Sequence, residues 1–195
     1  MLGLETARRT HWIWISLLAL ALAAAMLAVP RGPAEAALPS KQVWLADVAE
    51  AMRGSHGYLD RRAGGSGSRL AVNLDIDNTA IASHYDPGDP VLDVLRFTRH
   101  ARSLGYDILF NTGRKATSSL RASTLRQLDR NGYHVDELCM RRVGESIVDG
   151  KRRCRRQFEA QGYTVTANVG NSSTDFAGGD YERAFKLPSY NGQLN

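Results

Sequence analysis

Hydrophobic and polar positions follow two different rhythms along the chain. Residues 41–53 carry apolar side chains at helical spacing, which predicts an amphipathic helix. Residues 60–68, DRRAGGSGS, are rich in glycine and serine and predict a loop. From Leu70 onward, short apolar runs typical of buried strands alternate with amphipathic segments typical of helices.

The alternating part of the chain predicts a series of strand–helix units. We expect strands at 70–75, 106–111, 138–140, 163–169 and 184–187. We expect helices at 90–103, 116–131 and 150–161. Strands and helices that alternate at this spacing predict an α/β fold with a mostly parallel sheet.

Polar side chains follow several of these strands directly. The run LAVNLDIDNTAI ends in Asp75 and Asp77, ILFNTGR brings Asn111–Thr112 to a strand end, and residues 170–175 follow a later strand. Ligands of such sheets bind at the carboxyl ends of the strands, so we expect these residues to share one rim. A buried carboxylate is costly and two neighbouring ones repel, so a cation between Asp75 and Asp77 would account for the pair.

The first 36 residues carry a different signal. A basic start precedes an uncharged apolar run over 12–29, which is followed by an A-E-A pattern at 34–36. This order predicts a signal peptide cleaved near Ala36, and therefore a secreted, periplasmic or cell-surface protein. The run is also long enough to span a membrane, so an uncleaved anchor is the alternative. We expect a leader over 1–36 and one folded domain over 37–195.

Charge and cysteine content add two open questions. The chain of 195 residues has a net charge of +5, which suits either a well-solvated basic surface or an acidic partner such as a phosphate ester, nucleic acid or membrane. The run KRRCRR at 151–156 is expected to be a solvated helix face, with nucleic-acid or anionic-lipid binding as the alternative. In an exported chain, Cys139 and Cys154 can form a disulfide; two buried free thiols are the alternative.

The segment LDIDNTAI resembles the D-x-D-x-T signature of the haloacid dehalogenase superfamily of phosphotransferases. The later motifs of that superfamily have counterparts in the same order: Thr112 in ILFNTGR, Lys151 near a helix start, and the loop NVGNSSTDF. The resemblance covers 69–176 and is greatest to the secreted acid phosphatases of the class B and plant vegetative-storage-protein type. It implies a Rossmann-like, three-layer sandwich of the haloacid dehalogenase type with a minimal cap.

The resemblance also implies roles for the matched residues. Asp75 would attack phosphorus and form an aspartyl-phosphate, while Asp77 would protonate the leaving oxygen and then deprotonate water. Thr112 would hydrogen-bond a phosphoryl oxygen, and Lys151 would neutralise charge on Asp75 and the phosphoryl group. Substrate contacts are expected from Thr112, Gly113, Arg114 and Lys151.

A magnesium ion is the implied cofactor. Its expected ligands are Asp75, Asp77 through the backbone carbonyl, Asn171 and Asp175. The family pattern usually has an acid where this chain has Asn171. An amide oxygen can bind Mg²⁺ but brings no charge, so we expect weaker metal binding, with Asp175 as the compensating ligand.

These observations favour an exported, Mg²⁺-dependent phosphomonoesterase that acts on small phosphate esters. One alternative is a non-catalytic phosphate- or metal-binding storage or scavenging protein of the same fold, which Asn171 favours. A second is a basic nucleic-acid-binding domain, which the arginine run favours. For the enzyme, nucleic acid is expected only as a substrate, and membrane contact only if the leader is retained.

Overall fold

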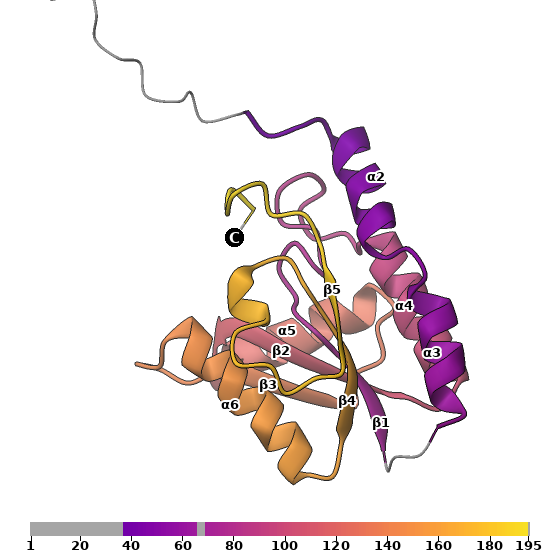
Figure 1. Ribbon diagram of the computed structural model, residues 1–195. Helices are drawn as coiled ribbons and strands as arrows, with labels where there is room; N and C mark the ends of the chain where they lie inside the picture. Colours follow the sequence, from indigo (N-terminus) through magenta and orange to yellow (C-terminus); the bar gives the residue numbers. More distant parts are fainter. Residues whose placement is uncertain (1–36, 66–68, 195) are drawn as a thin grey trace, which may run out of the picture. The chain divides into compact units, whose positions relative to one another are not determined.

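A computed structural model describes residues 37–65 and 69–194, and the expected leader with its cleavage site lies outside these residues. The described part contains a five-stranded sheet in the order β3-β2-β1-β4-β5, in which every neighbouring pair is parallel (Figure 1). The predicted α/β fold with a parallel sheet is confirmed. The strands are β1 (Leu70–Leu74), β2 (Asp107–Lys115), β3 (Glu137–Arg141), β4 (Thr164–Gly170) and β5 (Arg183–Lys186).

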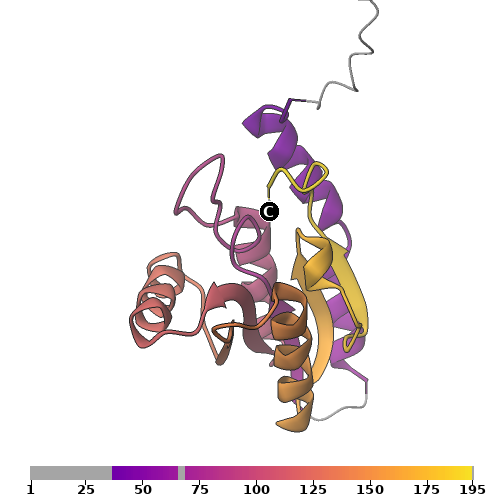
Figure 2. The same cartoon turned by 90° about the vertical axis from the view of Figure 1, so that its left-hand side faces the viewer.

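Helices connect the strands and cover both faces of the sheet (Figures 1 and 2). They are α2 (Lys41–Ala51), α3 (Ser55–Ala63), α4 (Leu92–Ser103), α5 (Ser118–Arg130), α6 (Ile147–Ala160) and the short 3₁₀ helix η1 (Ser173–Asp175). No helix within the described ranges has the length and apolar character needed to cross a membrane.

Two hydrophobic cores lie on opposite faces of the sheet. Ala71 and Leu109 pack in the smaller core with Phe158 of α6, whereas their neighbours Val72 and Ile108 pack in the larger core. Successive strand residues point to opposite faces, so apolar side chains are needed at consecutive positions. This requirement explains why the strands are continuous apolar runs rather than alternating ones.

The order of the strands reverses beside β1. The chain proceeds from β1 through α4 to β2 and through α5 to β3, and α6 then returns it to β4 on the other side of β1. The carboxyl ends of β1 and β4 therefore lie side by side at the point where the strand order reverses. Open α/β sheets bind their ligands at such a position.

Several elements differ from their sequence-based bounds; β2, for example, continues to Lys115 rather than ending at Asn111. Residues 60–63, expected as loop, are the last residues of α3. The buried Leu59 and an Arg62–Glu182 ion pair hold this helix in place, and its sequence shows no clear apolar period from which it could be predicted. Helix α6 begins at Ile147 rather than Gly150, because the Ser146 side chain caps it by accepting from the Asp149 N–H.

Candidate active site

A buried charge cluster lies at the carboxyl ends of β1 and β4. Asp75 directly follows β1, and its N–H donates to the Val169 carbonyl of β4 at 3.0 Å. Lys151, 4% exposed, extends from α6 and donates from Nζ to Asp75 Oδ1 at 2.7 Å and also to Asp175 Oδ1. One lysine therefore lies between two buried carboxylates, which come from segments far apart in the sequence.

The loop after β4 holds Asp175 in this cluster. The Ser172 N–H donates to Asp175 Oδ2 at 2.8 Å, so both carboxylate oxygens of Asp175 are engaged. A Cβ at Gly170 would lie 2.5 Å from Asp175 Cγ, so the close approach of this carboxylate to β4 requires glycine there. The fully buried Arg155 of α6 donates to the backbone carbonyl oxygens of Asp175 (2.7 Å) and Gly179 (2.6 Å), which fixes the loop.

The electrostatics of the cluster centre on Asp75. Burial disfavours its charged form and raises its pKa to about 7, against the opposing effect of Lys151 and with a further increase from Asp175. Burial also disfavours the charged form of Lys151, but the two carboxylates together raise its pKa. Lysine alone thus leaves Asp75 only partly stabilised as an anion, and additional positive charge beside it would favour ionisation.

Asp77 lies in a contrasting environment, with its side chain 48% exposed. Arg114 donates to both carboxylate oxygens, from Nε to Oδ2 at 2.9 Å and from Nη2 to Oδ1 at 2.6 Å. The Nη1 of Arg114 donates to Thr124 Oγ1 (3.1 Å) and Gln127 Oε1 (2.9 Å) of α5. Arg114, expected to contact substrate, therefore orients Asp77 in this structure.

Thr112 and Gly113 lie within β2, next to Arg114. Thr112 is buried, and its Oγ1 accepts from the Arg114 N–H at 3.2 Å. Gly113 lines the pocket described below, whereas Thr112 is not among the residues that line it. The expected contact between Thr112 and a phosphoryl oxygen stays a prediction.

These residues surround one pocket of about 480 Å³. Its lining includes the predicted site residues Asp75, Asp77, Gly113, Arg114, Lys151 and Asn171. Residues from the segment after β1, from β2, from α6 and from the loop after β4 thus meet at one cavity, and Asp175 is linked to it through its ion pair with Lys151.

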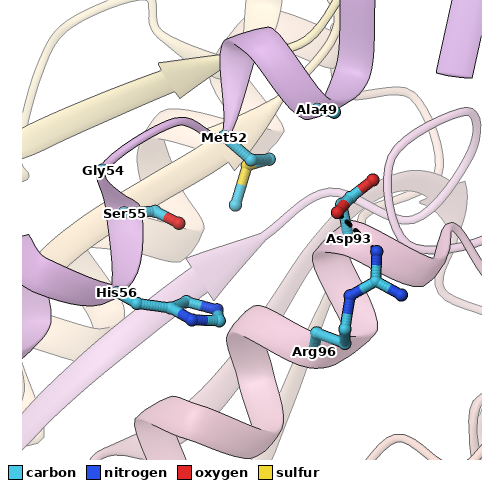
Figure 3. A pocket seen from close by; sticks show the side chains of 7 residues that line it. All are labelled: Ala49, Met52, Gly54, Ser55, His56, Asp93 and Arg96. Carbon is cyan, nitrogen blue, oxygen red and sulfur yellow. Dashed lines mark hydrogen bonds and ion pairs between the residues drawn. The ribbon is translucent and has the colours of Figure 1, made fainter. Parts of the chain in front are cut away.

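A second pocket, of about 210 Å³, lies between α4 and the α2–α3 junction and contains none of the predicted site residues (Figure 3). Asp93 and Arg96 of α4 line it, and their side chains are already paired at 2.6 Å. His56 points into it from α3. We place the chemistry in the larger of these two pockets, because a buried carboxylate, a buried lysine and a half-exposed carboxylate converge there.

The larger pocket holds oxygen donors that bear on the expected Mg²⁺. Across residues 37–65 and 69–194, no three His, Cys, Asp or Glu side chains cluster in a way that would hold a metal ion. The pocket instead offers mixed oxygen donors from Asp75, Asp77 and Asn171. Oxygen ligands are those that Mg²⁺ prefers, and a dication would supply the positive charge that buried Asp75 lacks, so these residues fit the ion. Asp175, expected as a ligand, is engaged by Lys151 and Ser172.

Comparison with known families agrees with this arrangement. The model of the HAD superfamily, subfamily IIIB (acid phosphatase) matches residues 85–193, more than half of the chain. The chain belongs to this family. It is therefore a phosphatase of the haloacid dehalogenase superfamily, as the resemblance of its motifs predicted. The matched range begins after Asp75 and Asp77, so the roles of these two residues stay predictions.

Solved structures with the same fold include phosphatases. The class C acid phosphatase from Bacillus anthracis is 16% identical, with a TM-score of 0.62 over 76% of this chain and 79% of that one. Its structure with tungstate bound gives 17% identity and a TM-score of 0.61, with the same coverage. A chain of the Pnkp1/Rnl/Hen1 complex is 17% identical, with a TM-score of 0.52 over 64% of this chain and 48% of that one. No curated protein matched.

Sequence reasoning missed the polar residues that support the site. The run KRRCRR was expected to be a solvated helix face, but Lys151 and Arg155 are buried and only Arg152 and Arg156 are exposed. Burial of Lys151 and Arg155, four residues apart, follows from the side of α6 that faces the sheet. Asn168 of β4, which donates to the Asp175 carbonyl at 3.0 Å, was also missed. An amide side chain inside a buried strand was the available signal.

Proposed function

We propose that this phosphatase is an exported, Mg²⁺-dependent phosphomonoesterase that works through an aspartyl-phosphate on Asp75. The observation that carries the proposal is the placement of Asp75, Lys151 and Asp77 around one pocket. Asp75 is buried and bonded to Lys151, which suits a fixed nucleophile. Asp77 is open to solvent and oriented by Arg114, which suits proton transfer.

The proposed reaction has two steps. A carboxylate oxygen of Asp75 bonds to phosphorus as the ester P–O bond breaks, and the leaving oxygen takes a proton from Asp77. Asp77 then removes a proton from water, whose oxygen bonds to phosphorus as the P–O bond to Asp75 breaks. Lys151 holds Asp75 in position and offsets charge on the phosphoryl group. This sequence releases alcohol and phosphate and regenerates the Asp75 carboxylate and the protonated carboxylic acid of Asp77, from which the cycle starts.

Mg²⁺ would be held by Asp75, the Asp77 backbone carbonyl and the Asn171 amide oxygen, where it would supply positive charge to the phosphoryl oxygens. In this arrangement we assign Asp175 to the positioning of Lys151. The chain's own contribution is a preset geometry in which the nucleophile, the lysine and the acid–base residue already lie at one cavity. Small phosphomonoesters are the proposed substrates, because the site is an open pocket.

Export is a further part of the proposal. The apolar run and the A-E-A pattern of the sequence support it, and so does the disulfide that joins Cys139 of β3 to Cys154 of α6. Disulfides persist in oxidising compartments and are rare in the cytosol. N-terminal sequencing of the mature protein is expected to begin near residue 37; a mature chain that keeps the apolar run would instead favour a membrane anchor.

The enzyme proposal is tested by release of nitrophenol from nitrophenyl phosphate. We expect turnover with Mg²⁺, loss of turnover with EDTA, and a loss of about 10⁴-fold or more in Asp75→Asn. Asp60→Asn, which changes an exposed carboxylate on α3, is the matched control and should keep full activity. Undiminished turnover in Asp75→Asn would refute the assignment of the nucleophile.

The principal alternative is a protein of the same fold that binds phosphate or metal with little turnover. Asn171 favours it, because an amide replaces the acid that the family pattern usually has at this position. Calorimetric titration with inorganic phosphate separates the two. Phosphate binding without nitrophenol release under any metal condition would favour the alternative.

A further inference from the structure

The side chain of Asn171 is held by the C-terminal segment of the chain. Asn171 directly follows β4, is 2% exposed and lines the larger pocket. Its Nδ2 donates to the backbone carbonyl of Leu194 at 2.7 Å. Its Oδ1 accepts from the Thr79 hydroxyl at 3.3 Å. The two ends of the amide therefore have chemically distinct partners, which fixes which way it points.

The same carbonyl also binds the loop that carries Asp77. Asn78 Nδ2 donates to the Leu194 carbonyl at 2.8 Å. Asn78 Oδ1 accepts from the N–H groups of Ser83 (2.9 Å) and His84 (3.1 Å), so Asn78 organises this loop. One carbonyl oxygen thus accepts from both asparagines and joins the loop after β1 to the loop after β4.

The carbonyl itself is firmly placed. The Leu194 side chain is buried in the larger core, and the Leu194 N–H donates to the Ser189 carbonyl at 3.1 Å. Upstream, the Leu187 N–H donates to the Gly170 carbonyl at 2.8 Å, and the Tyr190 hydroxyl donates to Asp47 at 2.7 Å. The segment 187–194 is therefore fixed to the sheet, to α2 and to the core.

We propose that the Leu194 carbonyl selects an amide at position 171 and orients its oxygen for the metal. A carboxylate at this position would have no donor for the carbonyl and would bring two acceptor oxygens together at about hydrogen-bond distance, in a buried place where such a pair is costly. The asparagine is then a residue matched to the C-terminal segment rather than a weakened acid. The inference rests on the proposed function in one respect, the binding of Mg²⁺ beside Asn171.

The proposal is tested by measuring Mg²⁺ affinity in a cycle of four proteins. Asn171→Asp is made in the full chain and in a chain that ends at Gln193, and Mg²⁺ alone is titrated by calorimetry. In the full chain, Asn171→Asp is expected not to tighten Mg²⁺ binding. In the shortened chain, the same substitution should tighten it by about tenfold, because the added charge no longer faces a carbonyl. Equal tightening in both backgrounds would overturn the proposal.

Hydrogen exchange gives a second reading that needs no metal. In the full chain, the side-chain NH₂ of Asn171 should exchange at least about tenfold more slowly than that of exposed Gln161. Leu194→Ala keeps the carbonyl and should keep this protection. Fast exchange at Asn171 in the full chain would overturn the proposal, whether or not the shortened chain folds. Failure of the unaltered chain to bind Mg²⁺ would count instead against the proposed function.

Discussion

The two carboxylates of the D-x-D motif are two residues apart in the chain and lie in opposite environments. In the buried half of the site, Asp75 is 7% exposed and shares the buried Lys151 with Asp175. In the exposed half, Asp77 has a half-exposed side chain paired with Arg114. A nucleophile benefits from fixed geometry and compensated charge, whereas an acid–base residue must exchange protons with solvent. The difference therefore separates two chemical roles.

The local backbone explains how neighbouring residues reach such different places. Asp75 stays attached to the sheet through its N–H bond to Val169. The chain then leaves the sheet, and Asn78 adopts a left-handed conformation with φ of 52°, which asparagine tolerates better than most residues. Asp77 is thereby directed out of the core and toward Arg114.

The largest expected effect on stability comes from removing the cation of the buried half. Lys151→Met leaves Asp75 and Asp175 buried without their partner, and breaking a buried ion pair in this way typically costs about 3–5 kcal/mol of unfolding free energy. We also expect a loss of hydrolysis of about 10³-fold. Urea unfolding and steady-state kinetics measure the two effects.

Lys115→Met is the matched control for this substitution. Lys115 is exposed at the end of β2, so its loss should change the unfolding free energy by less than about 0.5 kcal/mol. If both lysine variants unfolded at the same urea concentration, the ion pairs of Lys151 with Asp75 and Asp175 would not stabilise the buried half as described above.

The next effect should separate activity from stability in the exposed half. Asp77→Asn keeps the shape of the side chain but removes the transferable proton, so we expect kcat to fall about 10²-fold. Because the side chain is half exposed, the unfolding free energy should change by less than about 1 kcal/mol. A loss of stability as large as that of Lys151→Met would contradict the division into two halves.

Sequence patterns predicted this division only in part. The strands, and the meeting of Asp75 with Asn171 at one edge of the sheet, follow from apolar runs and from the rule that strand ends share a rim. The place of Lys151 beside Asp75 was implied only by the family resemblance. The contrast between Asp75 and Asp77 does not follow from these patterns, because it depends on where the chain leaves the sheet.

The hydrogen bonds by which Arg155 fixes the loop of Asp175 could not be predicted from the sequence for a related reason. In KRRCRR the sequence does not distinguish one basic residue from another, and only packing against the sheet decides which ones are buried. Helix α3 has too few buried apolar positions to reveal its period.

Removing the disulfide tests whether the position of Lys151 in the buried half depends on the covalent link between α6 and β3. Cys139 and Cys154 are 15 residues apart, and closing a loop of this size stabilises a fold by about 3 kcal/mol in the chain-entropy description. The double variant Cys139→Ser/Cys154→Ser should lose up to this amount in urea unfolding. Its kcat should stay within about twofold, because the Asn111 side chain independently donates to the Lys151 carbonyl at 2.8 Å. A large fall in kcat would mean that the disulfide positions Lys151.

The smallest effect concerns a partly exposed ion pair between Glu145, in the loop that leads into α6, and Arg153 of α6 itself. Arg153 donates to Glu145 at 2.8 Å and, with the Arg142 N–H, lowers the pKa of this carboxyl from 4.5 to about 2. Because the folded pKa lies below the unfolded one, the pair stabilises fully above about pH 5, and its contribution is lost as the pH falls toward 2. Solvent screening limits the contribution to about 1 kcal/mol.

Glu145→Gln should therefore unfold at a lower urea concentration than the unaltered chain at pH 7. The gap between the two unfolding midpoints should narrow between pH 5 and pH 3. A gap that does not change with pH would mean that Glu145 stabilises through its shape and hydrogen bonds rather than through its charge. Partly exposed ion pairs would then contribute even less to the unfolding free energy than the comparison with the buried half implies.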